Sequence, residues 1–388
     1  MKIAILTSGI MPVPAVQGGA VETLIDHYLE YNDKHKLHDI TVFSIYHPAV
    51  KKQQALLSDV NHYQHIDTSS LIAKARKRIH SLVHKNTYYH NSIDFYFQQS
   101  LNIIKKRHFD CIIIENRPGF APQLHETVST KIVLHLHNDF LNNQTKEYKT
   151  IYDSATRIIT VSDYINERVQ TCCPHDEKTI TVYNGIDLTP YSVVTSLSRE
   201  SLGFQEDDFI LAFSGRLILE KGILELIEAM NCLRDLPRIK LLVMGSSFYD
   251  NTSGENPFIM ELKSKTQKLG NRIKFTGYID HKMIPQYLKL SDVAVIPSTW
   301  EEPFGLTVVE GMAAGLPVIT TNSGGIPEIC DGVATIVNRD DIVNNLAAAI
   351  LDLYEYPEKR AAMSEASLER SKLFDKETYA KNFFEALE

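Results

Sequence analysis

Two cations in the second half of the chain have the types and the spacing that suit a diphosphate. Arg216 follows a short apolar run, and Lys221 comes five residues later, beside Gly222, where a helical pattern begins. An arginine fork and a lysine point charge next to a helix N-terminus favour paired phosphate groups. The motif by itself leaves a plainer alternative open, in which both residues are surface cations without a ligand.

Two glutamates eight positions apart form a second candidate site. Glu302 lies in a loop after another apolar run, and Glu310 lies about one turn into a helix that we expect to begin near Leu306. The first N–H groups of a helix have no partner within it, so those of Phe304, Gly305 and Leu306 would face an anion. This spacing could place one carboxylate on a sugar and the other on a ribose.

A pair of glycines in the first loop, Gly18 and Gly19, precedes an apolar helical pattern. Glycines at a strand-to-helix turn let backbone N–H groups approach a phosphate at the helix N-terminus. The loop lacks the dinucleotide pattern G-x-G-x-x-G, and the chain lacks the P-loop pattern G-x-x-x-x-G-K-[ST]. A flexible turn is the alternative for this pair taken alone.

Short apolar runs alternate with longer helical patterns along the whole chain, as in buried strands joined by crossover helices. The alternation predicts an α/β fold with two doubly wound, Rossmann-like domains and parallel sheets. Helices are expected at Glu220–Arg234 and Pro257–Leu269. The runs expected to be strands are Lys2–Thr7, Ile40–Tyr46, Cys111–Ile114, Lys131–Leu136, Arg157–Val161, Thr179–Tyr183, Phe209–Ser214, Lys240–Met244, Arg272–Thr276, Asp292–Ile296 and Pro317–Thr321.

A polar stretch at Asp187–Asp208 interrupts this alternation and predicts a linker. We expect an N-terminal domain over residues 1–190, a C-terminal domain over 191–370, and a final helix within 371–388 that packs back toward the N-terminal domain. Ligands of doubly wound folds bind at the carboxyl ends of the parallel strands. The site is therefore expected in a cleft between the two domains.

A basic helical pattern falls in the first half of the chain. Residues 71–85 combine five lysines or arginines with apolar residues at helical spacing, although the net charge of the chain is −8. One interpretation is the solvated face of a helix that packs on its own domain. The other is contact with an anionic membrane surface or a phosphate-bearing acceptor.

Composition and missing motifs exclude several classes of protein. With 40 basic against 48 acidic residues, no nucleic-acid partner is expected. No apolar run approaches the roughly 20 residues of a membrane-spanning helix. The first residues lack a cleavage site, and their pattern indicates a buried strand rather than a signal peptide. Five cysteines without a CxxC pair indicate a reducing cytoplasm, and with no HExxH and only scattered histidines no metal site is expected.

These motifs together resemble those of the retaining glycosyltransferases of the GT-B fold, family 4. The resemblance spans nearly the whole chain, is most specific in the second half, and loosens between Pro48 and Phe109. The segments that carry it are Gly18-Gly19, Gly215-Arg216, Lys221-Gly222, and Glu302-Pro-Phe-Gly-Leu with Glu310.

The resemblance implies that Arg216 and Lys221 bind the diphosphate of a nucleotide-sugar donor, and that Gly18 and Gly19 face the same phosphates. The chain has no Asp-x-Asp motif, which the other large glycosyltransferase fold uses to hold a divalent metal. The two cations would therefore take the place of a metal, and no cofactor is expected besides the donor substrate.

For the remaining motifs, the resemblance implies contacts with the other parts of the donor. Glu302 and the backbone of residues 304–306 would contact the donor sugar, and Glu310 would accept hydrogen bonds from the ribose. Tyr278 lies in the segment that would line the base.

His137, at the end of a first-half strand, matches the family's active-site histidine. His135 lies one strand period away on the same face, and the sequence does not decide which of the two fills the role. A hydrogen-bonded structural role is the alternative for both.

The expected function is transfer of a sugar from a nucleotide diphosphate sugar, a UDP-sugar by family frequency, to a glycan or lipid-linked acceptor. The resemblance implies retained anomeric configuration and a role in bacterial surface-polysaccharide assembly, in the cytoplasm or at the inner face of the membrane. Rival interpretations are a GT-B enzyme with a small soluble acceptor, a sugar-nucleotide epimerase, and a two-domain sugar-binding protein without catalysis. A dehydrogenase is disfavoured because the dinucleotide pattern is absent.

Overall fold

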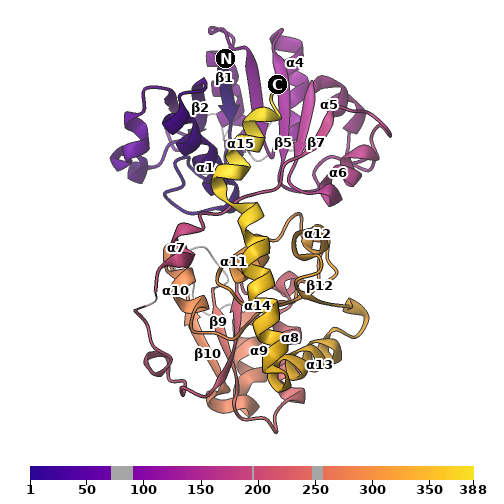
Figure 1. Ribbon diagram of the computed structural model, residues 1–388. Helices are drawn as coiled ribbons and strands as arrows, with labels where there is room; N and C mark the ends of the chain where they lie inside the picture. Colours follow the sequence, from indigo (N-terminus) through magenta and orange to yellow (C-terminus); the bar gives the residue numbers. More distant parts are fainter. Residues whose placement is uncertain (71–90, 195, 247–256) are drawn as a thin grey trace. The chain divides into compact units, whose positions relative to one another are not determined.

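The computed structural model describes residues 1–70, 91–194, 196–246 and 257–388 of the chain (Figure 1). Within these ranges the chain forms two compact units. Unit 1 consists of Met1–Asn184 and Glu377–Glu388, and unit 2 consists of Gly185–Lys376. Each unit has one parallel sheet with helices, so the predicted α/β fold class is confirmed.

Unit 1 has a seven-stranded sheet with the order β3-β2-β1-β4-β5-β6-β7, in which every pair of neighbours is parallel. The central strands carry runs such as Ile-Ile-Ile because both of their faces are covered. The strands are β1 (Lys2–Leu6), β2 (Asp39–Ile45), β3 (Asn61–Ile66), β4 (Cys111–Glu115), β5 (Lys131–Leu136), β6 (Arg157–Thr160) and β7 (Thr179–Thr181).

The helices of unit 1 include one from the far end of the chain. Figure 1 shows α15 (Lys376–Glu385) alongside α1 (Ala20–His35), and the ring of Phe383 stacks on that of Tyr28 with centroids 4.3 Å apart. The last twelve residues thus complete the core of the first unit. The other helices among the described residues of unit 1 are α3 (Asn91–Ile104), α4 (Ala121–Thr127), α5 (Tyr148–Ser154) and α6 (Asp163–Gln170), with 3-10 turns η1 (Pro48–Lys52), η2 (Gln54–Leu57) and η3 (Pro118–Phe120).

Unit 2 has a six-stranded sheet with the order β10-β9-β8-β11-β12-β13, again with parallel neighbours. The direction of winding reverses between β8 and β11, which makes this edge a switch point where ligands bind in open α/β sheets. The strands are β8 (Phe209–Ser214), β9 (Ile239–Met244), β10 (Ile273–Gly277), β11 (Val293–Ile296), β12 (Val318–Thr321) and β13 (Thr335–Val337).

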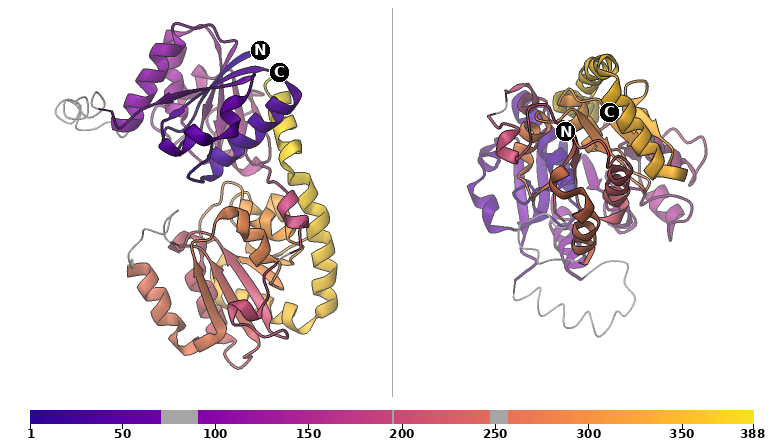
Figure 2. Two further views of the ribbon diagram at one scale, coloured as in Figure 1. Left: turned by 90° about the vertical axis from the view of Figure 1, so that its left-hand side faces the viewer. Right: turned by 90° about the horizontal axis from the view of Figure 1, so that it is seen from below.

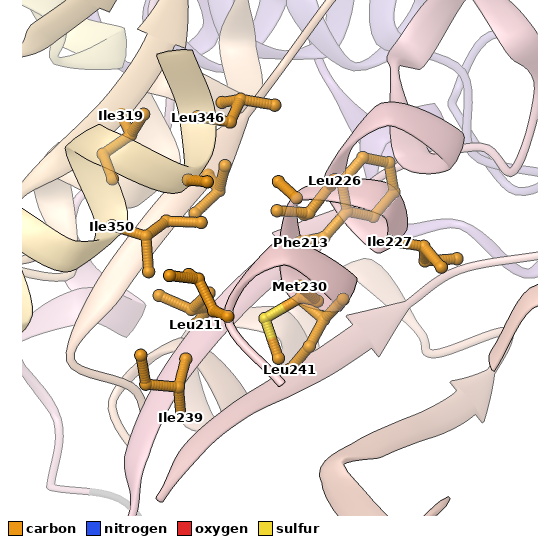
Figure 3. Packing of buried hydrophobic residues seen from close by; sticks show 14 of the residues in the cluster. Leu211, Phe213, Leu226, Ile227, Met230, Ile239, Leu241, Ile319, Leu346 and Ile350 are labelled. Carbon is orange, nitrogen blue, oxygen red and sulfur yellow. The ribbon is translucent and has the colours of Figure 1, made fainter. Parts of the chain in front are cut away.

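One face of this sheet packs against α8 (Ile223–Cys232), α9 (Pro257–Thr266) and α13 (Ile342–Glu355). Figure 3 shows side chains of β8 and β9, such as Leu211 and Leu241, meeting Met230 of α8 and Ile350 of α13. The opposite face carries α11 (Leu306–Ala313), which is covered in turn by α14 (Pro357–Ser371). Figure 2 shows α9 and α14 on opposite sides of the strands of this unit.

The described residues of unit 2 also form three short helices and several 3-10 turns. The helices are α7 (Thr189–Ser192), α10 (Ile284–Leu288) and α12 (Ile326–Cys330). The turns are η4 (Glu200–Leu202), η5 (Leu219–Lys221), η6 (Gln267–Arg272), η7 (His281–Met283), η8 (Arg339–Asp341) and η9 (Lys372–Phe374).

The eleven expected strands all form, with ends that differ by a residue or two, but β3 and β13 were not anticipated. Both are edge strands, and an edge strand needs less apolar sequence than a central one. β3 has the polar sequence Asn-His-Tyr-Gln-His-Ile, and β13 has three residues. Helix α8 begins at Ile223, after the expected Glu220, because Gly222 is left-handed.

The chain passes between the units six residues before the expected boundary at 190, and returns six residues after the expected boundary at 370. Most of the predicted linker is folded into unit 2, where Arg199 pairs with Asp292 at 3.1 Å. The basic pattern at residues 71–85 lies outside the described residues, so its role stays a prediction. Among the helices that the structure describes, none has the length and apolar character needed to cross a membrane.

Candidate functional site

The carboxyl edge of the unit 2 sheet gathers the residues expected to bind a donor. Arg216 follows β8, Tyr278 follows β10, and Glu302 lies in the loop after β11. Lys221 ends the turn η5 after β8, and Glu310 lies in α11. Because carboxyl ends of parallel strands share one edge, residues up to 94 positions apart in sequence come to one region.

Lys221 and Glu302 form a direct ion pair at this edge. Lys221 Nζ lies 2.5 Å from Glu302 Oε1, and Ser298 Oγ donates to the same oxygen at 2.5 Å. The Glu302 side chain is 8% exposed and that of Lys221 is 20% exposed. A carboxylate this deeply buried needs such partners to stay charged. The ring of Trp300, the one tryptophan of the chain, is centred 5.9 Å from the same Nζ.

The backbone that carries Lys221 is held by a close approach that glycine alone allows. Gly222 has a φ of 69°, and a Cβ on it would lie 1.8 Å from the carbonyl oxygen of Pro297. Thr299 N donates to Glu220 O at 3.0 Å in the same place. The turn after β8 is thereby fixed against the end of β11, which brings the predicted cation to the predicted carboxylate.

Helix α11 begins at Leu306, as expected, and its N-terminus lies next to Glu302. Its N-cap is Gly305, at a φ of 117°, and no side chain caps it. Phe304 is buried, and the carbonyl of Glu302 accepts a hydrogen bond from Gly325 N at 2.8 Å. First-turn N–H groups and the partial positive charge of the helix are therefore presented beside the ion pair. Their contact with an anion stays a prediction.

Glu310 contacts a histidine that the sequence analysis did not single out. His281 Nε2 donates to Glu310 Oε1 at 2.7 Å. The hydrogen bond and the charge of Glu310 favour the protonated ring, so the pKa of His281 is raised above its ordinary value of 6.5. The only sequence signal was its position shortly after Gly277, in the segment expected to line the base. Tyr278, in that same segment, is 43% exposed.

In unit 1, Gly19 lies against a neighbouring carboxyl group. A Cβ on Gly19, which has a φ of 100°, would lie 2.3 Å from Glu22 Oε2. Glu22 is buried and accepts a hydrogen bond from Ser8 Oγ at 3.2 Å, and burial raises the pKa of its carboxyl group. Gly18, at a φ of 75°, has open space at its Cβ position. The expected contact of both glycines with donor phosphates stays a prediction.

The two candidate histidines of β5 meet one carboxylate. Glu115, the last residue of β4, pairs in register with His135 of β5. Its Oε2 lies 3.0 Å from His135 Nδ1 and 2.9 Å from His137 Nε2, and its Oε1 accepts from Tyr28 Oη at 2.9 Å. Both histidines are therefore joined through a residue that the sequence analysis missed, and all are buried.

Burial and the charges of neighbouring groups, together with hydrogen bonds, set the protonation states in this cluster. Burial alone would raise the pKa of Glu115, but the two histidines more than offset it and lower that pKa to about 2. Burial and the neighbouring His135 lower the pKa of His137 to about 4. At neutral pH, Glu115 is therefore an anion, and His137 is a neutral ring that donates its Nε2–H to it.

The cluster corrects the expectation that histidines are merely scattered. Glu115, His135 and His137 each place one ligand atom within 4.8 Å of the others, as a metal site could. The fit to a metal is poor, because a metal-bound histidine usually donates its second ring N–H to a partner. Among the described residues, His135 Nε2 and His137 Nδ1 are buried without one. The distances of 2.9 to 3.2 Å are those of hydrogen bonds.

Two α/β units, each with one sheet of parallel strands, form the framework of a GT-B glycosyltransferase. The second unit carries two cations and two buried carboxylates at one edge of its sheet. Two family models match the chain: Glycosyltransferase Family 4 over residues 33–190, and Glycosyl transferases group 1 over residues 194–370. The chain belongs to this family of GT-B glycosyltransferases, as the sequence motifs predicted.

Curated relatives and solved structures agree with this assignment. Spore coat protein SA of Bacillus subtilis is 29% identical, over 95% of this chain and 93% of its own length. The lipopolysaccharide 1,2-N-acetylglucosaminetransferase of Salmonella typhimurium is 28% identical, over 66% of this chain and 68% of its own. The crystal structure of Anabaena HepE in complex with UDP and glucose superposes with a TM-score of 0.75 at 23% identity, covering 100% of this chain and 99% of that one, and shares the fold.

Proposed function

We propose that this glycosyltransferase moves a sugar from a nucleotide diphosphate sugar, a UDP-sugar, to a glycan or lipid-linked acceptor with retention of anomeric configuration. The observation that carries the proposal is the ion pair of Lys221 and Glu302 at the N-terminus of α11. It holds a cation for phosphates and an acceptor for sugar hydroxyls at adjacent positions. The UDP and glucose bound to HepE support the choice of donor.

The site residues would stabilise the charge that the reaction creates. When the bond between the anomeric carbon and the diphosphate breaks, negative charge grows on the departing nucleoside diphosphate. Lys221, the exposed Arg216 and the N-terminus of α11 would supply fixed positive charge to it. Glu302, released from Lys221 as the phosphates take the cation, would accept hydrogen bonds from the sugar.

Retention would follow from substitution on one face of the sugar. The new bond to the acceptor oxygen would form on the face from which the diphosphate leaves, and the acceptor proton would pass to a departing phosphate oxygen. His137 is neutral at pH 7, which suits hydrogen bonding to a sugar hydroxyl better than electrostatic attraction. The ionised Glu115 would keep this ring in its Nε2–H form.

The acceptor and the biological setting are proposed from relatives. The Salmonella relative is a lipopolysaccharide sugar transferase, and a further relative in Bacillus subtilis is named for teichuronic acid biosynthesis. Both names point to cell-surface glycans. We therefore propose a surface glycan or its lipid-linked precursor as the acceptor of this protein.

The test measures sugar transfer from labelled UDP-sugars with a glycan acceptor. Arg216→Ala and Lys221→Ala should each lower turnover by about 10²- to 10³-fold, the usual cost of one transition-state donor. Arg234→Ala, an exposed cation at the other end of α8, should behave like wild type. Normal turnover in both site variants would contradict the diphosphate role.

The same assay run with excess chelator tests metal independence. Turnover should persist, because the positive charge comes from side chains and a helix N-terminus. If turnover were lost in chelator and restored by magnesium or manganese, metal independence would be contradicted. The anomeric configuration of the product tests retention directly.

A further inference from the structure

The carboxylate assigned to the ribose is already engaged by a side chain of the same unit. Oε1 of Glu310 accepts a hydrogen bond of 2.7 Å from His281 Nε2. The side chain of Glu310 is 7% exposed, whereas that of His281 is 68% exposed. A solvated histidine ring thus contacts a buried carboxylate. A ribose that needs this oxygen must share it with His281 or replace it.

Sharing is unfavourable because the ribose and the imidazole need the lone pairs of one carboxylate. A ribose offers its 2′ and 3′ hydroxyls as neutral donors, and both need carboxylate lone pairs. In the contact with a protonated imidazole both partners are charged, whereas in a contact with a ribose hydroxyl only the carboxylate is, so the imidazole contact is the stronger one. The turn η7 that carries His281 also lies in the segment after Gly277 that is expected to line the base. A ribose whose two hydroxyls bind both carboxylate oxygens would therefore meet the imidazole at Oε1.

We propose that His281 competes with the donor ribose for Glu310, so that nucleotide binding displaces this histidine and releases its proton. The inference rests on the proposed function, since it takes Glu310 as the ribose acceptor. It follows that the protonation of His281 makes the affinity for the donor depend on pH.

The charged and titratable groups around His281 and Glu310 determine in which direction pH changes nucleotide affinity. Asp280, on the same loop, adds to the effect of Glu310 in favouring the protonated ring. Tyr191 of α7 also faces Glu310, but burial and this charge hold its pKa well above 10.0, so it stays neutral. His281 is the only histidine between residues 185 and 376. Near neutral pH, it is therefore the side chain of unit 2 suited to take up or release a proton.

The sign of the pH dependence follows. In the free protein, the pKa of His281 is raised by Glu310. After displacement it returns toward its ordinary value of 6.5, so binding releases a proton at pH values between the two. Affinity for nucleotide should rise with pH through this window and level off above it. Below the ordinary value, both states are protonated, so no proton is released and affinity stays at its lower level.

The experiment is calorimetric titration with UDP between about pH 6 and 8, in pairs of buffers that differ in ionisation enthalpy. Wild type should release protons on binding. His281→Gln keeps a hydrogen-bond donor but does not titrate, so the histidine contribution to proton release should disappear. At the acid end, His281→Gln and His281→Ala should bind UDP about two- to five-fold more tightly, the worth of an exposed ion pair.

Lys282→Ala is the matched control, because it removes an exposed neighbour of His281 from the same turn. This variant should release as many protons on binding as wild type does. Protons that UDP itself exchanges are common to both proteins, so they do not affect the comparison. Equal proton release in wild type and His281→Gln would overturn the inference, as would weaker UDP binding in both His281 variants. Absence of UDP binding in wild type and Lys282→Ala at every pH would instead overturn the proposed donor.

Discussion

At the scale of single residues, the two glutamates of the donor site are buried anions that each hold one cation. Glu302 pairs with Lys221, and Glu310 pairs with His281. A buried carboxylate without such a partner would be costly, because its charge would have lost water without compensation. In the proposed function, the donor replaces each of these ion pairs with contacts to its own phosphates or hydroxyls. Glu302 then contacts the donor sugar, and Glu310 contacts the ribose.

This difference predicts different kinetic effects for conservative substitutions. Glu310→Gln should raise the KM for donor about ten-fold with a smaller fall in kcat, because the ribose contact is present in ground and transition states alike. Glu302→Gln should lower kcat about 10²-fold, because its partner sugar is the reacting group. Steady-state kinetics with varied donor measures both.

Glu220→Gln serves as the control for these variants. Glu220 is an exposed acid next to Lys221, and its substitution should leave both constants near their wild-type values. A large fall in kcat for Glu310→Gln together with a raised KM for Glu302→Gln would show that the two roles are exchanged.

At the scale of elements, the donor edge depends on backbone segments that approach more closely than any side chain allows. The turn before α8 meets the end of β11 at Gly222, and the loop after β12 meets the loop of Glu302 at Gly324. A Cβ on Gly324 would lie 2.2 Å from Glu302 O. These two glycines therefore set the positions of the cation and of the carboxylate relative to each other.

Gly222→Ala tests this dependence. A left-handed alanine costs about 1 kcal/mol in backbone strain, and the collision with Pro297 O adds to it by forcing the turn away from β11. We expect a loss of more than about 2 kcal/mol in the free energy of unfolding, together with weaker UDP binding. Urea unfolding and UDP titration measure the two effects.

Gly203→Ala is the matched control, because Gly203 has a φ of 85° and open space at its Cβ position. An alanine there should have the backbone strain but no collision with another residue. The variant should therefore lose about 1 kcal/mol in the free energy of unfolding and bind UDP as wild type does. Equal losses of stability in the two variants would mean that the close approach at Pro297 contributes nothing.

At the scale of the whole molecule, the end of the chain belongs to the core formed by its beginning. Phe383 of α15 is fully buried, stacks on Tyr28 of α1, and lies with its ring centre 5.0 Å from that of His135. Tyr28 in turn donates to Glu115. Residues 377–388 therefore close the core of unit 1 beside the buried histidine cluster.

Phe383→Ala should lower the free energy of unfolding of unit 1 by about 3–5 kcal/mol, the usual cost of removing a buried aromatic ring. Unfolding followed by far-UV circular dichroism measures the loss. Trp300 lies in unit 2, so its fluorescence reports that unit separately. Leu373→Ala, at a residue that is 58% exposed, should change stability by less than about 0.5 kcal/mol. Matching stabilities of the two variants would contradict this account of α15.

Much of this protein could be predicted from its sequence, because the patterns concerned are local. A run such as Phe209–Ser214 is apolar on both faces because the strand is covered on both, and the alternation of such runs with helical patterns implied parallel sheets. The residues after these runs, among them Arg216 and Glu302, were candidates because carboxyl ends of parallel strands collect ligands. The edge strand β3 was missed because its sequence is polar, and it pairs with a single neighbouring strand.

The tertiary structure decided which of these residues meet. Lys221 and Glu302 are separated by 81 positions, and His281 and Glu310 by 29. Glu115 was not a candidate at all until strand register placed it opposite His135. A local pattern reports the environment of one segment but not the segment packed against it. The pairing of side chains from separate crossovers is therefore set by the sheet order and by the close backbone contacts at Gly222 and Gly324.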